Sequence, residues 1–204
     1  MNHIQVLEGN DAETAIRQLK NVVALSSSSD GSPTVSLLKQ EGYIVAPVIH
    51  KGTLTQDILK TIFEAAKTTG HDAMTAIGLY SAEELHCYGI PMTFEGLDEL
   101  RSTSCSVVNF VLYAGAPDWL VIFDDQLYVA YGPPAFVNAL VGDVGKAYQD
   151  LEAKINDLAT EFQGDVPSYV AQEIERMGSY LDSALIKLGE DYPKAQAGEL
   201  VSVL

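Results

Sequence analysis

The last quarter of the chain contains two ladders of apolar residues that recur every three or four positions. The first ladder consists of Val141, Val144, Tyr148, Leu151, Ile155, Leu158 and Phe162, and the second of Val170, Ile174, Met177, Leu181, Ala184 and Leu188. This spacing puts each set on one face of a helix, and the Gly164 to Pro167 segment between them ends one helix and starts the next. The pattern predicts an antiparallel helical hairpin over residues 143–189, whose apolar seam must be buried against its own body, a second copy or another protein.

The preceding residues, 1–142, mix strand and helix signals and are expected to form a body of their own. Runs of apolar and β-branched residues predict strands at residues 3–8, 22–25, 43–49, 74–80, 105–113, 119–123 and 127–131. This order favours an α+β fold, with a mixed, mostly antiparallel sheet and flanking helices, followed by the hairpin and a tail over residues 190–204.

Helix starts in the body are marked by residues that cap a first turn. Asn10 or Asp11, Thr53 and Thr93 each precede a helical apolar pattern. Prolines 133 and 134 suit the start of a further helix. Ser81, with Glu84 three residues later, forms a capping box that predicts a short helix through residues 86 and 87.

The charge balance narrows the classes of partner. The 204 residues include 28 acidic and 12 basic side chains, giving a formal net charge of −16, and residues 102–145 contain no Lys or Arg. Nucleic acids and anionic membranes are bound through cations, so we expect neither as a partner. The charge suits a basic protein partner, a cation, or solubility alone.

The location expected from the sequence is the cytoplasm. The N-terminal residues lack the basic start and apolar run of a secretory signal. The longest apolar stretch, residues 107–116, is far shorter than the roughly 20 residues of a membrane-spanning helix. Cys87 and Cys105 form no close-paired motif, which suits reduced thiols in a reducing compartment.

Four residues are candidates for a small-ligand pocket. His50 and Lys51 follow a predicted strand and precede a predicted helix, where backbone amides can hold an anion. His86 and Cys87 offer an imidazole and a thiol, although neighbouring helical residues point about 100° apart and Cys87 would need another histidine. Each pair also has a simpler explanation: His50 and Lys51 can belong to an ordinary strand-to-helix loop, and Cys87 can be a buried, inert thiol.

The sequence predicts no metal centre and no cofactor. The Glu83 to His86 step occurs once, whereas a carboxylate-bridged di-metal site needs it twice. Asp124 and Asp125 with Asp118 are better explained as turn formers than as a cation site. Neither a dinucleotide fingerprint nor a phosphate loop is present.

Candidate interaction residues come from the two apolar regions of the chain. Aromatic residues gather in the strands around Trp119, Tyr128 and Tyr131, and the hairpin adds Tyr148, Leu151, Ile155 and Leu181. Aromatic side chains dominate interface energetics when they face outward, and belong to the core when they face inward. Docking of the hairpin on its own body is the conservative interpretation, because a second acidic hairpin would be repelled.

Three functions follow as hypotheses. The first is a non-enzymatic, acidic, cytoplasmic protein-binding or adaptor protein that associates through the hairpin and the aromatic sheet, either as a homodimer or with a protein partner. The second is a small enzyme or ligand-binding module with a pocket near His50 and Cys87. The third is an acidic inhibitor or immunity-type protein that binds a basic partner.

Overall fold

The computed structural model describes residues 3–27, 33–38, 40–50, 54–80, 84–103, 109–123, 127–161 and 170–171. Several sequence predictions lie outside these residues: the roles of Lys51 and Leu181, the surroundings of Cys105, the tail, and most of the second hairpin helix. Within the described residues, no helix combines the length and apolarity that crossing a membrane requires.

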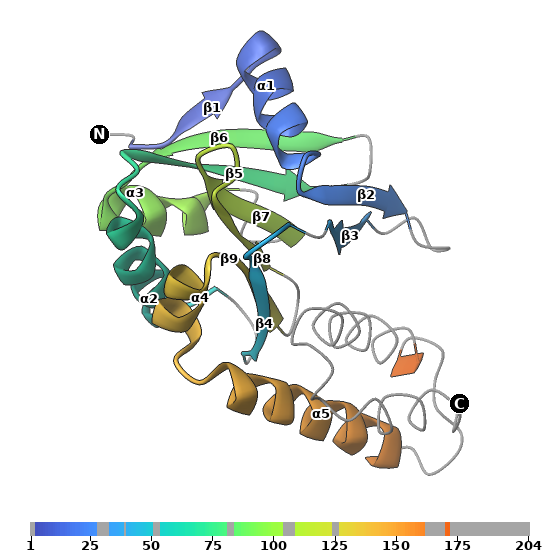
Figure 1. Ribbon diagram of the computed structural model, residues 1–204. Coiled ribbons are helices and arrows are strands. Elements are labelled where there is room, and N and C mark those ends of the chain that lie inside the picture. Colours follow the sequence, from blue (N-terminus) through green and yellow to red (C-terminus); the bar gives the residue numbers. More distant parts are fainter. Residues whose placement is uncertain are drawn as a thin grey trace.

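A seven-stranded antiparallel sheet forms the centre of the fold (Figure 1). Across the sheet the strands are β1 (Gln5–Leu7), β6 (Leu85–Pro91), β5 (Ala73–Leu79), β7 (Asn109–Ala114), β8 (Trp119–Phe123), β9 (Leu127–Gly132) and β4 (Ile44–Ile49). Both edge strands come from the N-terminal quarter of the chain and pair with strands that follow much later. The α+β class is therefore confirmed, with antiparallel pairing between all the described neighbours.

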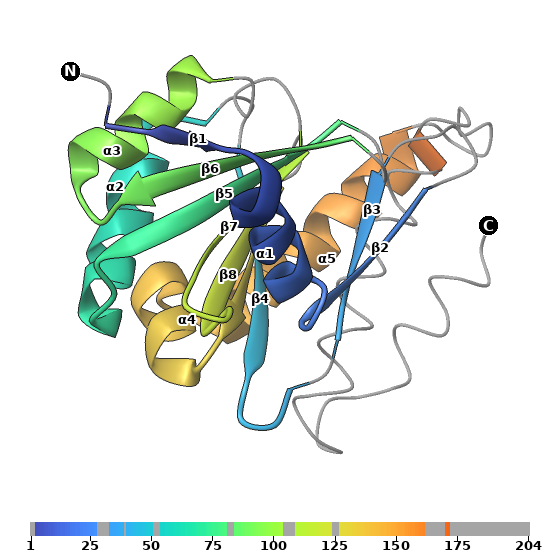
Figure 2. The same cartoon turned by 90° about the horizontal axis from the view of Figure 1, so that it is seen from above.

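Each face of the sheet is covered by a separate layer (Figures 1 and 2). One face packs against α2 (Gln56–Ala66), the short η1 (Lys67–Thr69), α3 (Phe94–Glu99), η2 (Leu100–Ser102) and α4 (Pro134–Val141). The other face packs against α1 (Gly9–Leu19), α5 (Val144–Glu161) and a two-stranded ribbon of β2 (Val23–Ser27) and β3 (Pro33–Leu37). Successive strand residues point to opposite faces, so the sheet feeds two apolar cores.

The helices of the first layer form where local signals predict them. Thr55 caps α2 by accepting a hydrogen bond from the Ile58 amide, and Thr93 caps α3 through the Gly96 amide. Gly70 ends the α2 region in the left-handed conformation, with φ of 79°. These caps satisfy amides that have no partner inside the helix, and the α2 cap is two residues later than predicted.

The helix predicted around His86 and Cys87 is wrong, because residues 85–91 form strand β6. This strand pairs on one side with β5 and on the other with β1, so its backbone groups are satisfied across the sheet. A capping box favours a helix only through local hydrogen bonds. Two ladders of long-range pairing outweigh that local preference.

The first helix of the predicted hairpin is confirmed as α5, and its apolar face packs on the sheet of its own chain. Leu151 is fully buried and Ile155 is 4% exposed. The Tyr148 hydroxyl donates a hydrogen bond to the Val45 carbonyl of edge strand β4. Val170 joins the same core. The described part of the seam is thus closed within one chain.

Candidate functional site

The residues predicted to share a ligand pocket lie far apart in the sheet. His50 follows β4 at one edge, whereas His86 and Cys87 lie on β6, next to the opposite edge. Four strands separate β4 from β6, and five interstrand spacings amount to roughly 24 Å. His86 and Cys87 also point to opposite faces of β6, with the imidazole exposed and the thiol buried. A single pocket therefore cannot contain His50 and Cys87.

Cys87 is a core residue of the α1 side of the sheet. Its side chain is 2% exposed, and burial raises the pKa of the thiol to about 11. A thiol with this pKa stays protonated at neutral pH, and the thiolate is the nucleophilic form. The environment of Cys87 is that of a small apolar side chain.

His50 has an unusual environment at the end of β4. Its ring stacks on Tyr128 with centroids 6.1 Å apart, and both ring nitrogens are buried without a hydrogen-bond partner among the described residues. A neutral imidazole carries one donor and one acceptor, and leaving buried polar atoms unsatisfied lowers the stability of the fold. Among the described members of the predicted pocket, His50, His86 and Cys87, it is His50 that shows a feature that ordinary packing does not account for.

The aromatic side chains predicted to contact a partner are buried within the chain. Trp119 is 1% exposed, Tyr128 6% and Tyr131 0%. The indole of Trp119 donates a hydrogen bond of 3.1 Å to the Thr69 hydroxyl and stacks on Phe136. These aromatics hold the layers together, since both faces of the sheet are covered.

The Tyr131 hydroxyl extends this role to the second layer. It donates a hydrogen bond of 2.6 Å to the Leu38 carbonyl, next to the β2–β3 ribbon. Tyr148, Leu151 and Ile155 are likewise buried, as described above. Because these six side chains are buried in the described fold, a partner that binds its surface does not contact them.

A polar cluster that the sequence did not predict lies at one end of the sheet. His71 Nε2 is 3.0 Å from Asp118 Oδ2, which joins the segment after η1 to the turn between β7 and β8. Burial, and then the charge of Asp118, raises the pKa of Tyr43. Pairing of β5 with β7 and of β4 with β9 brings these three residues together from distant parts of the chain.

Gly115 makes room for the His71–Asp118 pair. Its φ is +70°, and a Cβ on it would lie 2.6 Å from Asp118 Cγ and 3.0 Å from His71 Cε1. Glycine thus serves both the turn conformation and the close approach of the two side chains. The contact links the segment that follows η1 to the turn between β7 and β8.

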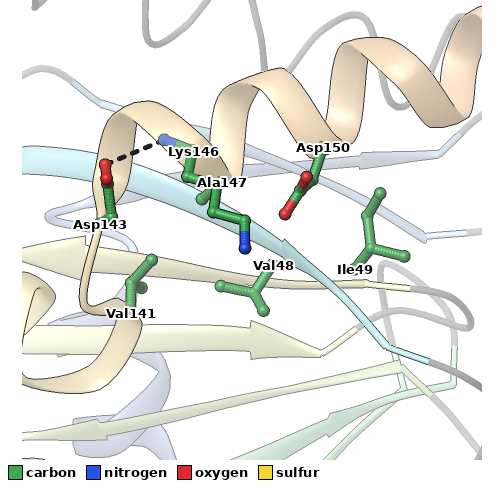
Figure 3. Close-up of a pocket in the computed structure, with 7 residues that line it drawn as sticks. All are labelled: Val48, Ile49, Val141, Asp143, Lys146, Ala147 and Asp150. Carbon is green, nitrogen blue, oxygen red and sulfur yellow. Dashed lines mark hydrogen bonds between the residues drawn. The ribbon is translucent and has the colours of Figure 1, made fainter.

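A shallow hollow of about 200 Å³ lies between β4 and the first turn of α5 (Figure 3). Val48 and Ile49 line its strand side, and Asp143, Lys146 and Asp150 lie along its helix side. Asp143 Oδ1 accepts a hydrogen bond of 3.0 Å from the Lys146 amide and so caps α5. The hollow is smaller than the roughly 300 Å³ at which small-molecule pockets usually begin.

Edge strand β1 combines an exposed apolar side chain with nearby carboxylates. Val6 is 59% exposed, and among the described strands β1 pairs with β6 alone (Figure 1). The Glu99 carboxylate lies at the start of β1, where it accepts a hydrogen bond of 2.7 Å from the His3 amide. Glu8, which is exposed, follows β1 directly.

Comparison with known proteins leaves the inference of function to this geometry. No protein-family model, no curated protein and no solved structure matches the chain.

Proposed function

We propose that the chain is a non-enzymatic, acidic protein-binding module whose partner is a basic protein. The observation that carries this proposal is the excess of carboxylates over Lys and Arg side chains that could neutralise them. Acidic side chains exceed basic ones by 16, and within the described residues the ion pairs of Lys or Arg with carboxylates are Lys67–Glu64 and Arg101–Asp98. Such a surface attracts a cationic partner and repels a second copy.

The route of association proposed from the sequence needs revision. Burial of Trp119, Tyr128 and Tyr131 supports a contact made by the polar surface and the sheet edge instead of by the aromatic face. Binding of the basic partner through the predicted second hairpin helix, with Leu181, remains part of the proposal. The proposal includes a cytoplasmic location. Inhibition of a basic enzyme is one form that the proposed binding can take.

The test is capture of partners at increasing salt concentration. The full chain, immobilised, is exposed to lysate of its source, and bound proteins are released in steps of NaCl and identified by mass spectrometry. We expect the specific partners to be basic and to be released as salt screens the acidic surface. A control chain with Asp11→Asn, Glu13→Gln and Glu95→Gln, all on exposed residues, should retain less of them.

Two outcomes would contradict the proposal. One is a specific partner whose retention is indifferent to salt and to the three substitutions. The other is recovery of the folded chain without any basic protein enriched over the control resin. Deleting the chain after Gly142 is unsuitable as a control, because α5 supplies part of the core.

A second candidate function, binding of a small polar ligand at His50, is favoured by its two unpartnered ring nitrogens. A ligand that supplies an acceptor and a donor there would relieve the cost of burying them. The imidazole resonances of His50, followed by NMR during a screen of small polar compounds, test it. Resonances that no compound shifts would remove this candidate and leave the first proposal untouched.

A further inference from the structure

The two edges of the sheet differ in how they are protected. At β4, Pro47 removes one backbone donor, and the Tyr148 hydroxyl from α5 occupies the Val45 carbonyl. Val45 and Pro47 are two residues apart, so both turn the same side of their backbone away from β9. Among the described residues, β1 has neither a proline nor a covering helix on its outer side. Within the described residues, the β4 edge is blocked, and the β1 edge, although only three residues long, is left unpaired.

Contacts at both ends hold β1 in position. Before β1, the His3 amide donates to Glu99; after it, the Glu8 carbonyl accepts from the Asp11 amide as α1 begins. On its inner side, Leu7 Cδ2 lies 3.2 Å from where a Cβ of Gly89 would be. Gly89 therefore gives Leu7 space to pack on β6. The strand is presented in extended form before any partner arrives, which lowers the entropy lost on binding.

The outer side of β1 offers the chemistry that strand addition uses. Alternate residues of an edge strand turn their amides and carbonyls outward, and these groups can pair with an extended peptide. Val6 adds an exposed apolar side chain beside this backbone. Backbone pairing supplies affinity in such complexes, and side-chain contacts along the strand supply specificity.

The charges around β1 indicate which kind of segment would pair with its outer side. Glu99 lies at the start of β1 and Glu8 at its end, within a chain of net charge −16. In an antiparallel pair of two β1 strands, Glu8 of each copy would approach Glu99 of the other, so like charges would meet at both ends. A segment with Lys or Arg on either side of an apolar residue instead places cations opposite both carboxylates.

We propose that β1 accepts an extended, basic segment of the partner protein as an eighth strand of the sheet. The segment carries an apolar residue that packs beside Val6, with Lys or Arg toward Glu8 and Glu99. This inference rests on the proposed function, because it names where and how the basic partner binds.

The experiment uses a fluorescent heptapeptide with blocked ends, in which Val stands at the centre, Lys two residues to each side and Thr elsewhere, so that Val and both Lys share one face of the strand. It is titrated with the full chain and followed by anisotropy. A matched peptide with N-methyl groups on the amides that would face β1 keeps charge and side chains but cannot donate to β1 in the orientation that places its Val beside Val6. We expect the N-methylated peptide to bind at least about tenfold more weakly. We also expect the unmodified peptide to slow amide hydrogen exchange at residues 5–7.

Variants place the binding on the chain. Val6→Lys should weaken binding of the unmodified peptide about tenfold, because it adds a cation to the edge. Leu38→Lys changes another large apolar residue that is exposed in the described part of the chain, at 40%, and should leave binding unchanged. Both sites are exposed, so both variants should keep the unfolding free energy within about 0.5 kcal/mol of the parent.

Equal binding of the two peptides, or a loss with Leu38→Lys but not with Val6→Lys, overturns the inference. So does a concentration-dependent dimer of the chain that protects residues 5–7 without any peptide, since a second copy would then be the occupant. If lysate capture still yields basic, salt-sensitive partners, the protein-binding function stands and only the edge assignment fails. If capture also yields none, both fail.

Discussion

Gly115 is the residue whose replacement best tests the polar cluster at the end of the sheet. Gly115→Ala introduces a Cβ at a φ of +70° and against the carboxyl group of Asp118. We expect the Asp118 side chain to rotate away from His71, so that the variant loses both the backbone conformation and the ion pair. Loss of free energy of unfolding should be about 2 kcal/mol, measured by urea denaturation.

Gly70→Ala is the matched control for this prediction. Gly70 has a φ of 79° and a ψ of 12°, in the left-handed region, with nothing within 4 Å of the added Cβ, so it reports the backbone strain alone. Its cost should be about 1 kcal/mol. Equal costs for the two variants, with the His71 imidazole resonances unchanged in Gly115→Ala, would mean that Gly115 does not make room for the pair.

His50→Phe should make the protein more stable. Phenylalanine keeps the ring against Tyr128 and removes two buried nitrogens that have no partner in the described part of the chain. We expect a gain of about 1 kcal/mol in unfolding free energy, measured by urea denaturation. His86→Phe is the control, because His86 also contacts a tyrosine ring, Tyr80, but is exposed. A marked loss of stability in His50→Phe would show that the imidazole is satisfied in solution.

At the scale of elements, α5 is part of the body and not an arm attached to it. Leu151→Ala empties a fully buried position between α5 and the sheet and should cost about 2–4 kcal/mol. Leu158→Ala, on the same helix but only partly buried, should cost clearly less. Thermal and urea unfolding of both variants measure the difference. Small and equal effects would indicate that α5 leaves the sheet in solution.

Elements with strong local signals were predictable from the sequence. The three- and four-residue spacing predicts α5, and Thr93 marks the start of α3, because these interactions lie within a few residues of each other. For α2 the apolar spacing predicts the helix, but its cap is Thr55 and not Thr53. Strand β6 was missed because its stability comes from β1 and β5, which a capping box at residues 81–84 does not reveal. Pairing with strands that are distant in sequence can thus override a local preference for helix.

The candidate sites were less predictable, because they depend on strand order. Nothing in the sequence near His71 or Asp118 indicates that the two residues meet. Likewise, the distance between His50 and Cys87 follows from the positions of β4 and β6 in the sheet. The aromatic strands were correctly located, but which faces are covered is decided by helices elsewhere in the chain.

At the scale of the whole molecule, the buried phenols and thiol make stability depend on alkaline pH. Burial raises the pKa of Tyr113 and Tyr131 to about 12 and that of Cys87 to about 11, and also raises that of Tyr128. In the unfolded chain these groups ionise near pH 9–10. Below that pH range these groups are protonated in both the folded and the unfolded state, so the full contribution of their burial to stability is present.

We therefore expect the free energy of unfolding to fall steadily from about pH 9 toward pH 12, since the folded state then binds more protons than the unfolded state. Urea denaturation across this range measures the fall, and tyrosinate absorbance should rise together with unfolding. Cys87→Ala should reduce the slope near pH 9–11. A flat profile up to pH 11 would contradict the burial of these groups.

The order of strands in the sheet also bears on the emergence of the chain from a ribosome. Strand β4 pairs with β9, and β1 pairs with β6, in each case about eighty residues later. Neither edge strand has its neighbour when it is synthesised, whereas β5 with β6 and β7 to β9 pair with close neighbours in sequence. Local pairs close fastest, so we expect the middle of the sheet to form first. Strands β1 and β4 therefore stay unpaired until β6 and β9 have been synthesised.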